Sequence, residues 1–416
     1  MKVGNGNASI NAKIWVWPYT VLVLYFVFEI TRLQTSLFPF LSPLKLPAIL
    51  TVSLIYYSVF VANKDVFKLK TTKLYLFFVF SIVLSSIFSA NFSVAFRPVI
   101  NCLVWLAVFF IPTINLLTTK KRISIFFFIF VACNTFIAIW GLTHGGRGPG
   151  SFTRDENDLA LYMSMAIPFS FYLSFQSNIS IKLKLFYRIS TAIIIMSIVA
   201  SFSRGGFLGL ISVVGIIWYI GQAKVKTVVL VILLSVPVGV IIVKSLPDGY
   251  IEDMQSISDE SNNTRNERLH SWNLALNMFY DSPIVGIGAS NYPRVVGEYE
   301  LKVGIPDGRR PLIWRAAHSL YFTLIPELGL LGVIAYFLFL RSIFNNVKVV
   351  YSDKRFHDND LIVLLAKAIF TSIIPFLVSG AFISVLFYPN IFIIAAFSIV
   401  IKRWYDASLE SKDEIS

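Results

Sequence analysis

Charged residues are scarce in this chain. They make up 14% of its 416 residues, against 56% hydrophobic residues and a mean hydropathy of +0.71. A soluble domain of this size needs far more polar surface, so the composition indicates an integral membrane protein. No internal repeat and no second, soluble domain are evident. The only two cysteines, Cys102 and Cys133, fall inside apolar stretches and say nothing about the redox compartment.

Signatures of common enzyme classes are also missing. The chain has no Walker loop, no hydrolytic triad and no metal-binding signature, and Gly286-Ile-Gly288 is too short for a dinucleotide fingerprint. The paired acids Glu252-Asp253 and Asp259-Glu260 stand in a Ser/Asn-rich stretch that is more typical of a solvated loop than of a cation site. We therefore expect neither a metal nor a cofactor. If the chain catalyses a reaction with a phosphate leaving group, arginine alone must neutralise the charge on that group.

Long apolar runs dominate the chain instead. A bilayer core takes about 20 apolar residues per helix, and about twelve such windows occur, so we predict an all-α polytopic membrane protein. The residues before the first window are polar and show no clear small-residue cleavage site, so we expect a retained helix and not a signal peptide. The windows begin near Ile14, Leu46, Leu74, Val99, Ile123, Leu159, Leu185, Gly206, Thr227, Ser319, Leu361 and Leu386.

Basic residues in the short loops give the expected orientation. Every second loop is rich in lysine, and the positive-inside rule places these loops in the cytoplasm. Both termini are then cytoplasmic. Residues 1–243 form the first nine spans, residues 244–317 form a large outer loop, and residues 318–416 form the last three spans and a cytoplasmic tail. The net charge of +13 is mostly explained by this topology and needs no nucleic acid partner.

The outer side favours arginine over lysine. Topology needs only positive charge, whereas the planar guanidinium can pair with two oxygens of a phosphate at once. The bias therefore indicates phosphate binding on the outer face, with contacts to lipid headgroups or loop ion pairs as the simpler alternative. The long loop itself is nearly neutral, because its acidic residues roughly offset its basic ones. The positions of single arginines matter more than their sum.

Two short outer segments carry such arginines. The loop after the fifth predicted span contains His144, Arg147, Arg154 and Asn157 among several glycines, and it is either a flexible turn or part of a substrate site. Arg204 lies between the seventh and eighth spans with almost no loop around it. An ionisable group at that depth is costly without a partner. We interpret Arg204 as a ligand for an anionic headgroup or a pyrophosphate, with a snorkelling side chain as the alternative.

Within the long loop, the spacing predicts one helix with a cationic, aromatic face. Asn263-Thr264 resembles a helix start, and Pro283, Gly286 and Gly288 are expected to end the helix and make a turn. Such a face suits either a helix lying on the membrane over a lipid-linked ligand or simple packing on the spans below. Its residues recur at spacings of three and four: Arg265, Arg268, Leu269, Trp272 and Leu276.

The loop ends in Arg315-Ala-Ala-His318, at the start of another apolar run. Three residues apart on a helix, Arg315 and His318 would share a face. The positive end of the helix dipole and the guanidinium both disfavour imidazolium, so we expect a neutral His318 that can act as a general base. A structural role is the alternative. His144 and His270 are weaker candidates, and His357 is expected to be solvated on the cytoplasmic side.

Glu327 lies inside the same apolar run, after Pro326 and before Gly329 and Gly332. Carboxylates within a membrane span are functional candidates. Glu327 could equally pair with an arginine of another helix to fix the fold, and the two glycines would allow close helix packing.

Taken together, these residues resemble the bacterial O-antigen ligase family, whose shared domain also occurs in some O-antigen polymerases and protein O-oligosaccharyltransferases. The resemblance covers roughly residues 150–332 in motifs and the whole chain in topology. One departure is Ser319, where many members have asparagine. The matching pieces are Ser203-Arg204-Gly205, Arg268-x-x-x-Trp272, Pro283-Ile-Val-Gly286-Ile-Gly288-Ala-Ser-Asn291-Tyr292, His318-Ser319-Leu320-Tyr321 and Glu327-Leu-Gly329-Leu-Leu-Gly332.

The resemblance implies a metal-independent, inverting glycosyltransferase of the GT-C type in the bacterial inner membrane, with its active site on the periplasmic face. It would move a glycan from undecaprenyl pyrophosphate to an acceptor hydroxyl. Arg204, Arg268 and Arg315 would hold the pyrophosphate, and His318 would deprotonate the acceptor. Arg265 and Arg147 are further candidates for the pyrophosphate site by their outer-face positions.

The acceptor is open at this point. Our leading hypothesis is a lipopolysaccharide O-antigen ligase that uses the lipid A core as acceptor. A polymerase acting on a second lipid-linked glycan and a ligase acting on a protein share the same chemistry. A transporter or flippase for lipid-linked sugars fits about twelve spans equally well, but polar residues gather on one face and no repeat is evident.

Overall fold

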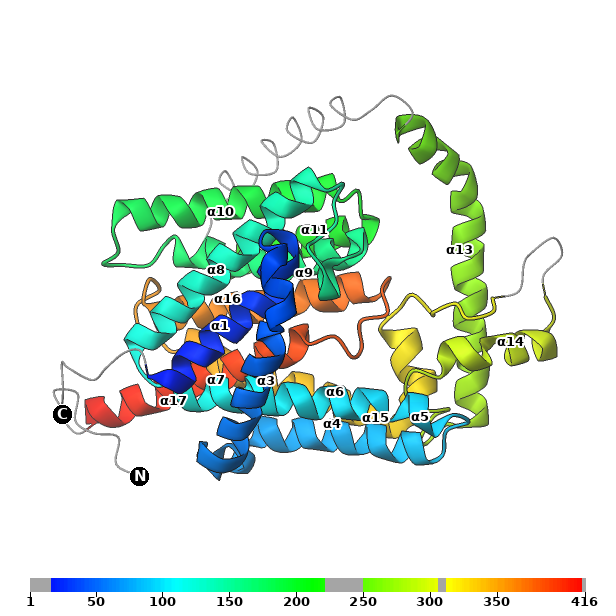
Figure 1. The fold of residues 1–416 in the computed structure, drawn as a ribbon, viewed down its shortest axis with the longest axis horizontal. Coiled ribbons are helices and arrows are strands. Elements are labelled where there is room, and N and C mark those ends of the chain that lie inside the picture. Colours follow the sequence, from blue (N-terminus) through cyan, green and yellow to red (C-terminus); the bar gives the residue numbers. More distant parts are fainter. Residues whose placement is uncertain (1–15, 221–249, 306–311, 414–416) are drawn as a thin grey trace.

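The computed structural model describes residues 16–220, 250–305 and 312–413, and within these ranges it contains helices and no strands. The helices form a bundle of broadly parallel elements, and one long helix, α13, crosses its end (Figure 1). The start of α1 and the end of α17 lie at the opposite end of the bundle.

The helices before the long loop are α1 (Trp17–Thr31), α2 (Leu33–Ser36), η1 (Pro39–Leu44), α3 (Leu46–Tyr56), η2 (Tyr57–Val61), η3 (Lys64–Lys68), α4 (Lys70–Ile87), α5 (Phe92–Ala95), α6 (Arg97–Trp105), η4 (Leu106–Phe110), α7 (Ile111–Leu116), α8 (Lys120–Thr143), η5 (Ser151–Thr153), α9 (Glu156–Leu173), α10 (Ile181–Ala200) and α11 (Arg204–Tyr219). The helices that follow are α13 (Tyr250–Asp281), α14 (Tyr292–Val303), α15 (Tyr321–Tyr351), α16 (Leu361–Gly380) and α17 (Asn390–Asp413).

Seven helical stretches in the described part of the chain are long and apolar enough to cross a membrane. Helices also begin near four of the other expected span starts. Of these, α1 and α11 are apolar but shorter than the seven stretches, and α9 and α17 are long enough but too polar to be counted with them. The structure thus supports seven of the about twelve predicted spans by length and composition. The span expected from Thr227 lies outside the described residues. The stretches are Pro39–Val61, Lys70–Ile87, Phe92–Leu116, Lys120–Thr143, Ile181–Ala200, Tyr321–Tyr351 and Leu361–Gly380.

The centre of the bundle is aromatic. Phe397 of α17 packs edge-on against Phe127 of α8 with ring centroids 4.8 Å apart, and Phe130 and Phe169 join the same cluster. All four rings are buried. Helices in lipid gain little from the hydrophobic effect, so such close ring packing supplies much of what holds the bundle together.

The long loop is more helical than its sequence indicates. We expected a helix start at Asn263-Thr264, but α13 begins at Tyr250, 13 residues earlier. The two acidic pairs that we assigned to a solvated loop therefore lie on a helix. Asparagine and threonine are only mildly unfavourable inside helices, which explains why this cap-like pair lies within one. The predicted break is confirmed, because α13 ends at Asp281 and α14 begins at Tyr292.

The break after α13 docks against a second break, inside α15. Gly329 has φ +60° and ψ −166°, so the helix is interrupted there. The freed backbone groups of α15 pair with the segment after α13: Ile287 N–H donates to Pro326 O (2.9 Å), and Leu330 N–H donates to Pro283 O (2.8 Å). Backbone groups at a helix break must find such partners when they are buried. We call residues 283–290 together with 326–331 the backbone joint.

Glycine is required on both sides of the backbone joint. A Cβ at Gly286 would lie 2.4 Å from the carbonyl carbon of Glu327, and one at Gly329 would lie 2.5 Å from the carbonyl oxygen of Ile284. Both glycines also have positive φ. Glu327 completes the joint, because its carboxylate accepts hydrogen bonds from the N–H groups of Ser290 (2.7 Å) and Tyr292 (3.2 Å).

Candidate functional site

Arg204 is the first residue of α11, and its neighbours fix where it stands. The hydroxyl of Ser203 accepts a hydrogen bond from Gly206 N–H (3.0 Å) and donates one to Asn157 at the start of α9 (2.7 Å). Gly206 allows close approach, since a Cβ there would lie 2.2 Å from that of Ala160. The Ser-Arg-Gly-Gly sequence thus caps α11, presses it against α9 and leaves the Arg204 side chain exposed at the end of the bundle.

His318 stands just before α15, not on it. Its backbone is left-handed (φ +49°), and the helix begins only at Tyr321. Our expectation that Arg315 and His318 share a helical face is therefore wrong. A non-glycine residue in this conformation stores strain of about 1 kcal/mol or more, and such residues cluster at functional sites.

Two tertiary hydrogen bonds hold the His318 segment. Leu320 N–H donates to Gly380 O at the end of α16 (2.6 Å), and the indole N–H of Trp272 donates to Ala317 O (3.1 Å). The neighbouring residue of α16, Ser379, donates to Gly205 O (2.8 Å). The end of α16 therefore brings the start of α11, with Arg204, next to the His318 segment.

Ser319 has a structural role in this segment. It is buried, and its hydroxyl accepts a hydrogen bond from the N–H of Phe322 in the first turn of α15 (3.4 Å). Serine and asparagine are both preferred at helix starts for this reason. The Ser319 hydroxyl thus caps the first turn of α15.

Arg268 approaches the site from α13. It lies one helical turn before Trp272, whose ring stacks on Phe322 with centroids 4.7 Å apart and planes 8° apart. The half-buried side chain of Arg268 is thereby placed on the face of α13 that covers the His318 segment. Of the predicted cationic, aromatic face, Arg268 is half-buried and Trp272 contacts Phe322, but Leu269 is 49% exposed. The buried apolar residues of this part of α13 are Leu274, Ala275 and Met278, which the spacing did not select.

The charges of these groups act on one another. Burial lowers the pKa of Arg268, and the charge of Arg204 lowers it further. The pKa of His318 is also lowered, first by partial removal from water and then by the charges of Arg268 and Arg315, while Asp155 opposes them. The imidazole of His318 is thus favoured in its neutral form. This is the predicted direction of the pKa, but partial removal from water is its main cause, and Arg268 and Arg315 add to it without a shared helix face.

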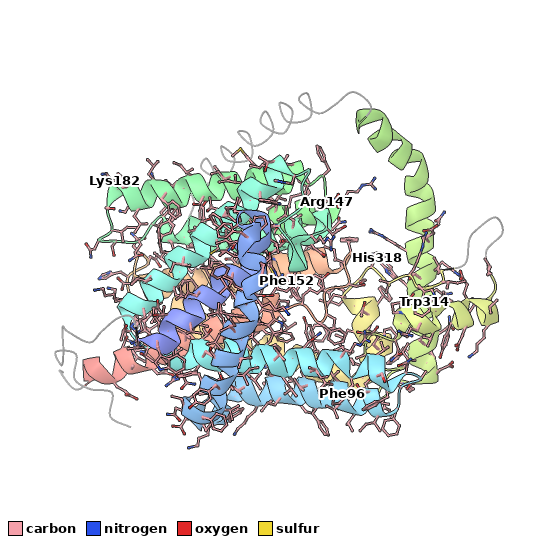
Figure 2. The ribbon with its side chains drawn as sticks, in the orientation of Figure 1. Phe96, Arg147, Phe152, Lys182, Trp314 and His318 are labelled. Carbon is pink, nitrogen blue, oxygen red and sulfur yellow. The ribbon has the colours of Figure 1, made fainter. Side chains whose placement is uncertain are left out.

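The five predicted arginines differ in their surroundings. Among the described residues, neither Arg204 nor Arg268 has a carboxylate within ion-pair distance. Arg315 forms an ion pair with Glu267 of α13, and Arg147 forms one with Glu156 at 2.7 Å. Arg147 lies at the same end of the bundle as His318 (Figure 2). The helix α13 includes Arg265, but its side chain lies outside the described residues.

The other histidines have structural surroundings. His270 contacts Glu300 (3.1 Å), a buried residue of α14 that also accepts from Leu312 N–H (2.6 Å). His270 thus links α13 and α14 to the segment that leads to His318. His144 stacks on Trp140 with centroids 3.9 Å apart.

Sequence reasoning missed two acidic residues near the site and the partners of a third. Asp155 caps α9 by accepting from Asn157 N–H (2.8 Å), and its charge acts on His318. Asp158, one turn further on, accepts from the hydroxyl of Tyr388 (3.0 Å). Glu327 was noticed, but its partners are backbone N–H groups and not an arginine. An Asp before a helix is a recognisable cap signal, whereas the other two pairings depend on residues more than 30 positions away.

Comparison with known proteins supports the family resemblance that the sequence motifs indicated. Residues 189–337 match the family model described as O-Antigen ligase. No curated protein matches the chain. The matched range contains Arg204, Arg268, Arg315, His318 and both halves of the backbone joint. The chain is therefore a multi-pass membrane protein that carries a domain of the O-antigen ligase family at residues 189–337.

Proposed function

We propose that this protein transfers a glycan en bloc from undecaprenyl pyrophosphate to an acceptor hydroxyl, as an O-antigen ligase, on the periplasmic face of the bacterial inner membrane. The lipid A core oligosaccharide is the acceptor that we favour. The proposal includes the GT-C architecture, about twelve spans and cytoplasmic termini. It also treats residues 1–243 and 318–416 as the transmembrane parts, and residues 244–317 as the periplasmic loop that covers the donor glycan.

One observation carries the proposal. Hydrogen bonds hold both the start of α11, with Arg204, and the α13 turn that carries Arg268 and Trp272 next to the His318 segment. In agreement with this geometry, the charge of Arg204 lowers the pKa of Arg268. Neither has a carboxylate partner among the described residues. Two guanidinium groups repel each other unless an anion lies between them, and a pyrophosphate offers oxygens to both forks.

Arg315 extends this anion site. In its ion pair with Glu267, the Arg315 side chain is 54% exposed and the Glu267 side chain 32%, so water screens the pair and a phosphate oxygen can replace the carboxylate. The salt bridge then serves to hold the guanidinium near His318 before the donor arrives. Arg147 and Arg265 are assigned to the outer rim of the same site.

The proposed reaction needs one base and one stabilised leaving group. The neutral imidazole of His318 takes the proton of the acceptor hydroxyl, and the acceptor oxygen forms a bond to the anomeric carbon of the donor. The bond from that carbon to the pyrophosphate oxygen breaks on the opposite face, which inverts the configuration. Arg204 and Arg268 stabilise the charge that develops on undecaprenyl pyrophosphate. No metal is invoked.

A transfer assay with purified protein in liposomes tests the proposal. The donor is an undecaprenyl-pyrophosphate glycan, and lipid A core, a second lipid-linked glycan and a pilin-like protein are offered separately as acceptors. We expect glycosylated lipid A core. Product only with the second glycan would reassign the protein as a polymerase, and product only with the protein would make it an O-oligosaccharyltransferase. Donor movement across the bilayer without any product would favour a transporter.

A His318→Ala variant separates binding from chemistry in the same assay. We expect it to bind the donor as the unsubstituted protein does and to lose transfer. His144→Ala is the matched control, because His144 stacks on Trp140 and takes no part in the proposed step. Retained turnover in His318→Ala would remove His318 from the role of base.

A further inference from the structure

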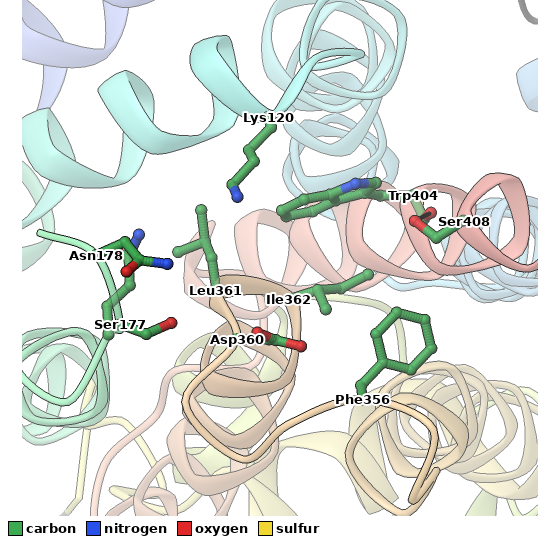
Figure 3. A pocket seen from close by; sticks show the side chains of 10 residues that line it. Lys120, Ser177, Asn178, Phe356, Asp360, Leu361, Ile362, Trp404 and Ser408 are labelled. Carbon is green, nitrogen blue, oxygen red and sulfur yellow. Dashed lines mark hydrogen bonds between the residues drawn. The ribbon is translucent and has the colours of Figure 1, made fainter. Parts of the chain in front are cut away.

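Figure 3 shows the residues that line a polar cavity of about 320 Å³. The cavity lies by the start of α8 and the C-terminal part of α17, at the end of the bundle opposite to α13 (Figure 1). Its walls come from the start of α8, the α9–α10 connection, the α15–α16 connection and α17. Lys120, Asp360 and Trp404 line it from three of these segments. The proposed transfer reaction uses none of these residues.

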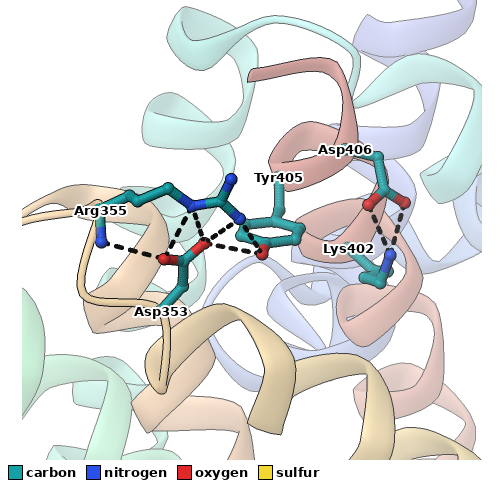
Figure 4. Close-up of polar contacts among 5 residues, drawn as sticks. All are labelled: Asp353, Arg355, Lys402, Tyr405 and Asp406. Carbon is teal, nitrogen blue, oxygen red and sulfur yellow. Dashed lines mark hydrogen bonds and ion pairs between the residues drawn. The ribbon is translucent and has the colours of Figure 1, made fainter. Parts of the chain in front are cut away.

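The cavity walls are cross-linked to one another. In the α15–α16 connection, Arg355 pairs with Asp353 (2.7 Å), and Tyr405 of α17 donates to the same carboxylate (2.8 Å; Figure 4). Phe356 packs on the Tyr405 ring, with centroids 5.6 Å apart. On the other side, the N–H of Ser177 in the α9–α10 connection donates to the backbone of Asn359 (3.1 Å). These contacts keep the cavity open in a fixed shape.

The charges around the cavity leave two groups available to a ligand. Arg355 pairs with Asp353, Lys402 with Asp406 and Lys367 with Asp358. Lys120 has no carboxylate within ion-pair distance among the described residues. Asp360 accepts one hydrogen bond, from His357 N–H (3.0 Å), and has no ion pair in the same part of the chain. The cavity therefore offers one positive and one negative group, with the Trp404 ring beside them.

An apolar cavity of about 280 Å³ adjoins the polar one. The two share Gln176 and Leu361 in their walls. The second is lined by Phe128 of α8 and by Leu183 and Tyr187 of α10. It thus begins where the polar cavity ends and runs along α8 and α10, two of the helices apolar enough to cross a membrane.

The depth of the two cavities matches the two parts of a lipid. Lys120 and Leu361 are the first residues of α8 and α16, which places the polar cavity where these helices enter the bilayer. The apolar cavity continues about two turns further along α8, at the level of the hydrocarbon. Headgroup and chain would each find matching surroundings.

We propose that these two cavities bind one zwitterionic phospholipid, with a phosphoethanolamine headgroup in the polar cavity and an acyl chain in the apolar one. The Lys120 ammonium pairs with the lipid phosphate. The lipid ammonium lies between the Asp360 carboxylate and the face of Trp404. Asp360 disfavours a purely anionic headgroup and Lys120 disfavours a purely cationic one, so the paired charges select a headgroup that carries both.

Native mass spectrometry of the delipidated, full-length protein tests this selection with phosphatidylethanolamine and phosphatidylglycerol of equal chain length. We expect tighter binding of phosphatidylethanolamine. Lys120→Gln should weaken the binding of both lipids about fivefold, whereas Asp360→Asn should weaken only phosphatidylethanolamine by about fivefold. Lys121→Gln and Glu410→Gln are matched controls that change the same charges at nearby exposed residues outside the cavity.

The outcomes separate the proposal from its rivals. Tighter binding of phosphatidylglycerol would indicate an anionic-lipid site and overturn the zwitterionic assignment. Equal binding in Lys120→Gln and Lys121→Gln would overturn the site itself. If a variant does not fold, phosphatidylethanolamine with a photoreactive acyl chain is used on the unsubstituted protein. Crosslinks at Phe128, Leu183 or Tyr187 would support the proposal, and crosslinks only elsewhere would refute it.

Discussion

The Glu327 carboxylate gives the most direct test of how the long loop is fixed. Its side chain is 1% exposed, and its two oxygens accept from the N–H groups of Ser290 and Tyr292 at 2.7 and 3.2 Å. Glutamine has nearly the same shape but only one accepting oxygen. A Glu327→Gln substitution therefore leaves one buried N–H group without a partner, which costs about 2 kcal/mol.

This cost should be visible locally. Hydrogen exchange of the Ser290 and Tyr292 amides requires opening of the start of α14, so a loss of about 2 kcal/mol should speed their exchange about thirtyfold. Exchange in α9, which lies in the centre of the bundle, should not change. The measurement is hydrogen-exchange mass spectrometry on peptides that cover residues 288–295.

Glu298→Gln is the matched control, because it makes the same change at an exposed position of α14. Exchange of residues 288–295 should stay at the unsubstituted rate in that variant. If Glu327→Gln also left the rate unchanged, the carboxylate would not be what holds these amides. The role assigned to Glu327 in the backbone joint would then be wrong.

Three further predictions concern the site and the joint. Arg204→Lys keeps the positive charge but loses the planar guanidinium, so the affinity for the donor should fall about tenfold. The control is Arg294→Lys, at an exposed position of α14, which should bind the donor as the unsubstituted protein does. Equal donor binding by both variants would show that the planar guanidinium of Arg204 does not hold the phosphate. Because its pKa is lowered, His318 should be deprotonated, and transfer active, down to a pH below the ordinary imidazole value near 6.5. Arg268→Gln removes one of the charges that lower the pKa of His318, so the acid limb of the pH–activity profile at saturating donor should move to higher pH. An unchanged acid limb would contradict the assignment of His318 as the base. Gly286→Ala adds a methyl group 2.4 Å from the backbone of Glu327 and should lower the free energy of unfolding by more than about 2 kcal/mol, as measured by thermal unfolding. In the control Gly145→Ala, where φ is similar but the space is open, the free energy of unfolding should fall by only about 1 kcal/mol. Similar losses in the two variants would show that the clash at Gly286 is relieved.

The sequence predicted those parts of the molecule that depend on local composition. Apolar runs located the helices, and Pro283 with the following glycines located the end of α13. The prediction was wrong where the three-residue spacing of Arg315 and His318 was taken as evidence that both lie on one helix. Arg315-Ala-Ala-His318 has good helix formers and the right spacing, yet a left-handed residue at His318 separates this stretch from α15. Only the tertiary hydrogen bonds of Ala317 and Leu320 decide that conformation.

The candidate site was predictable residue by residue but not as an arrangement. The outer-face arginines and the histidine could be named from their types and membrane positions. Their convergence depends on the end of α16, where Ser379 holds Gly205 and Gly380 holds Leu320. Nothing in the spacing of those residues indicates such contacts. The proximity of Arg204 to Arg268 also depends on the hydrogen bond from Trp272 of α13 to Ala317 O.

The way α13 is attached limits how the site can open. The C-terminal half of α13 is fixed to the His318 segment by the Trp272 hydrogen bond, and the backbone joint that follows it is fixed to α15. Lifting this half away would expose several buried backbone N–H groups, each costing about 1 to 3 kcal/mol. We therefore expect Arg268 and His318 to keep their relative positions through the reaction. The donor that we propose does not need that movement, because its polyprenyl chain would lie in the bilayer and its pyrophosphate would enter sideways between the helices. On this argument α13 is a fixed wall of the site at Arg268, and not a lid.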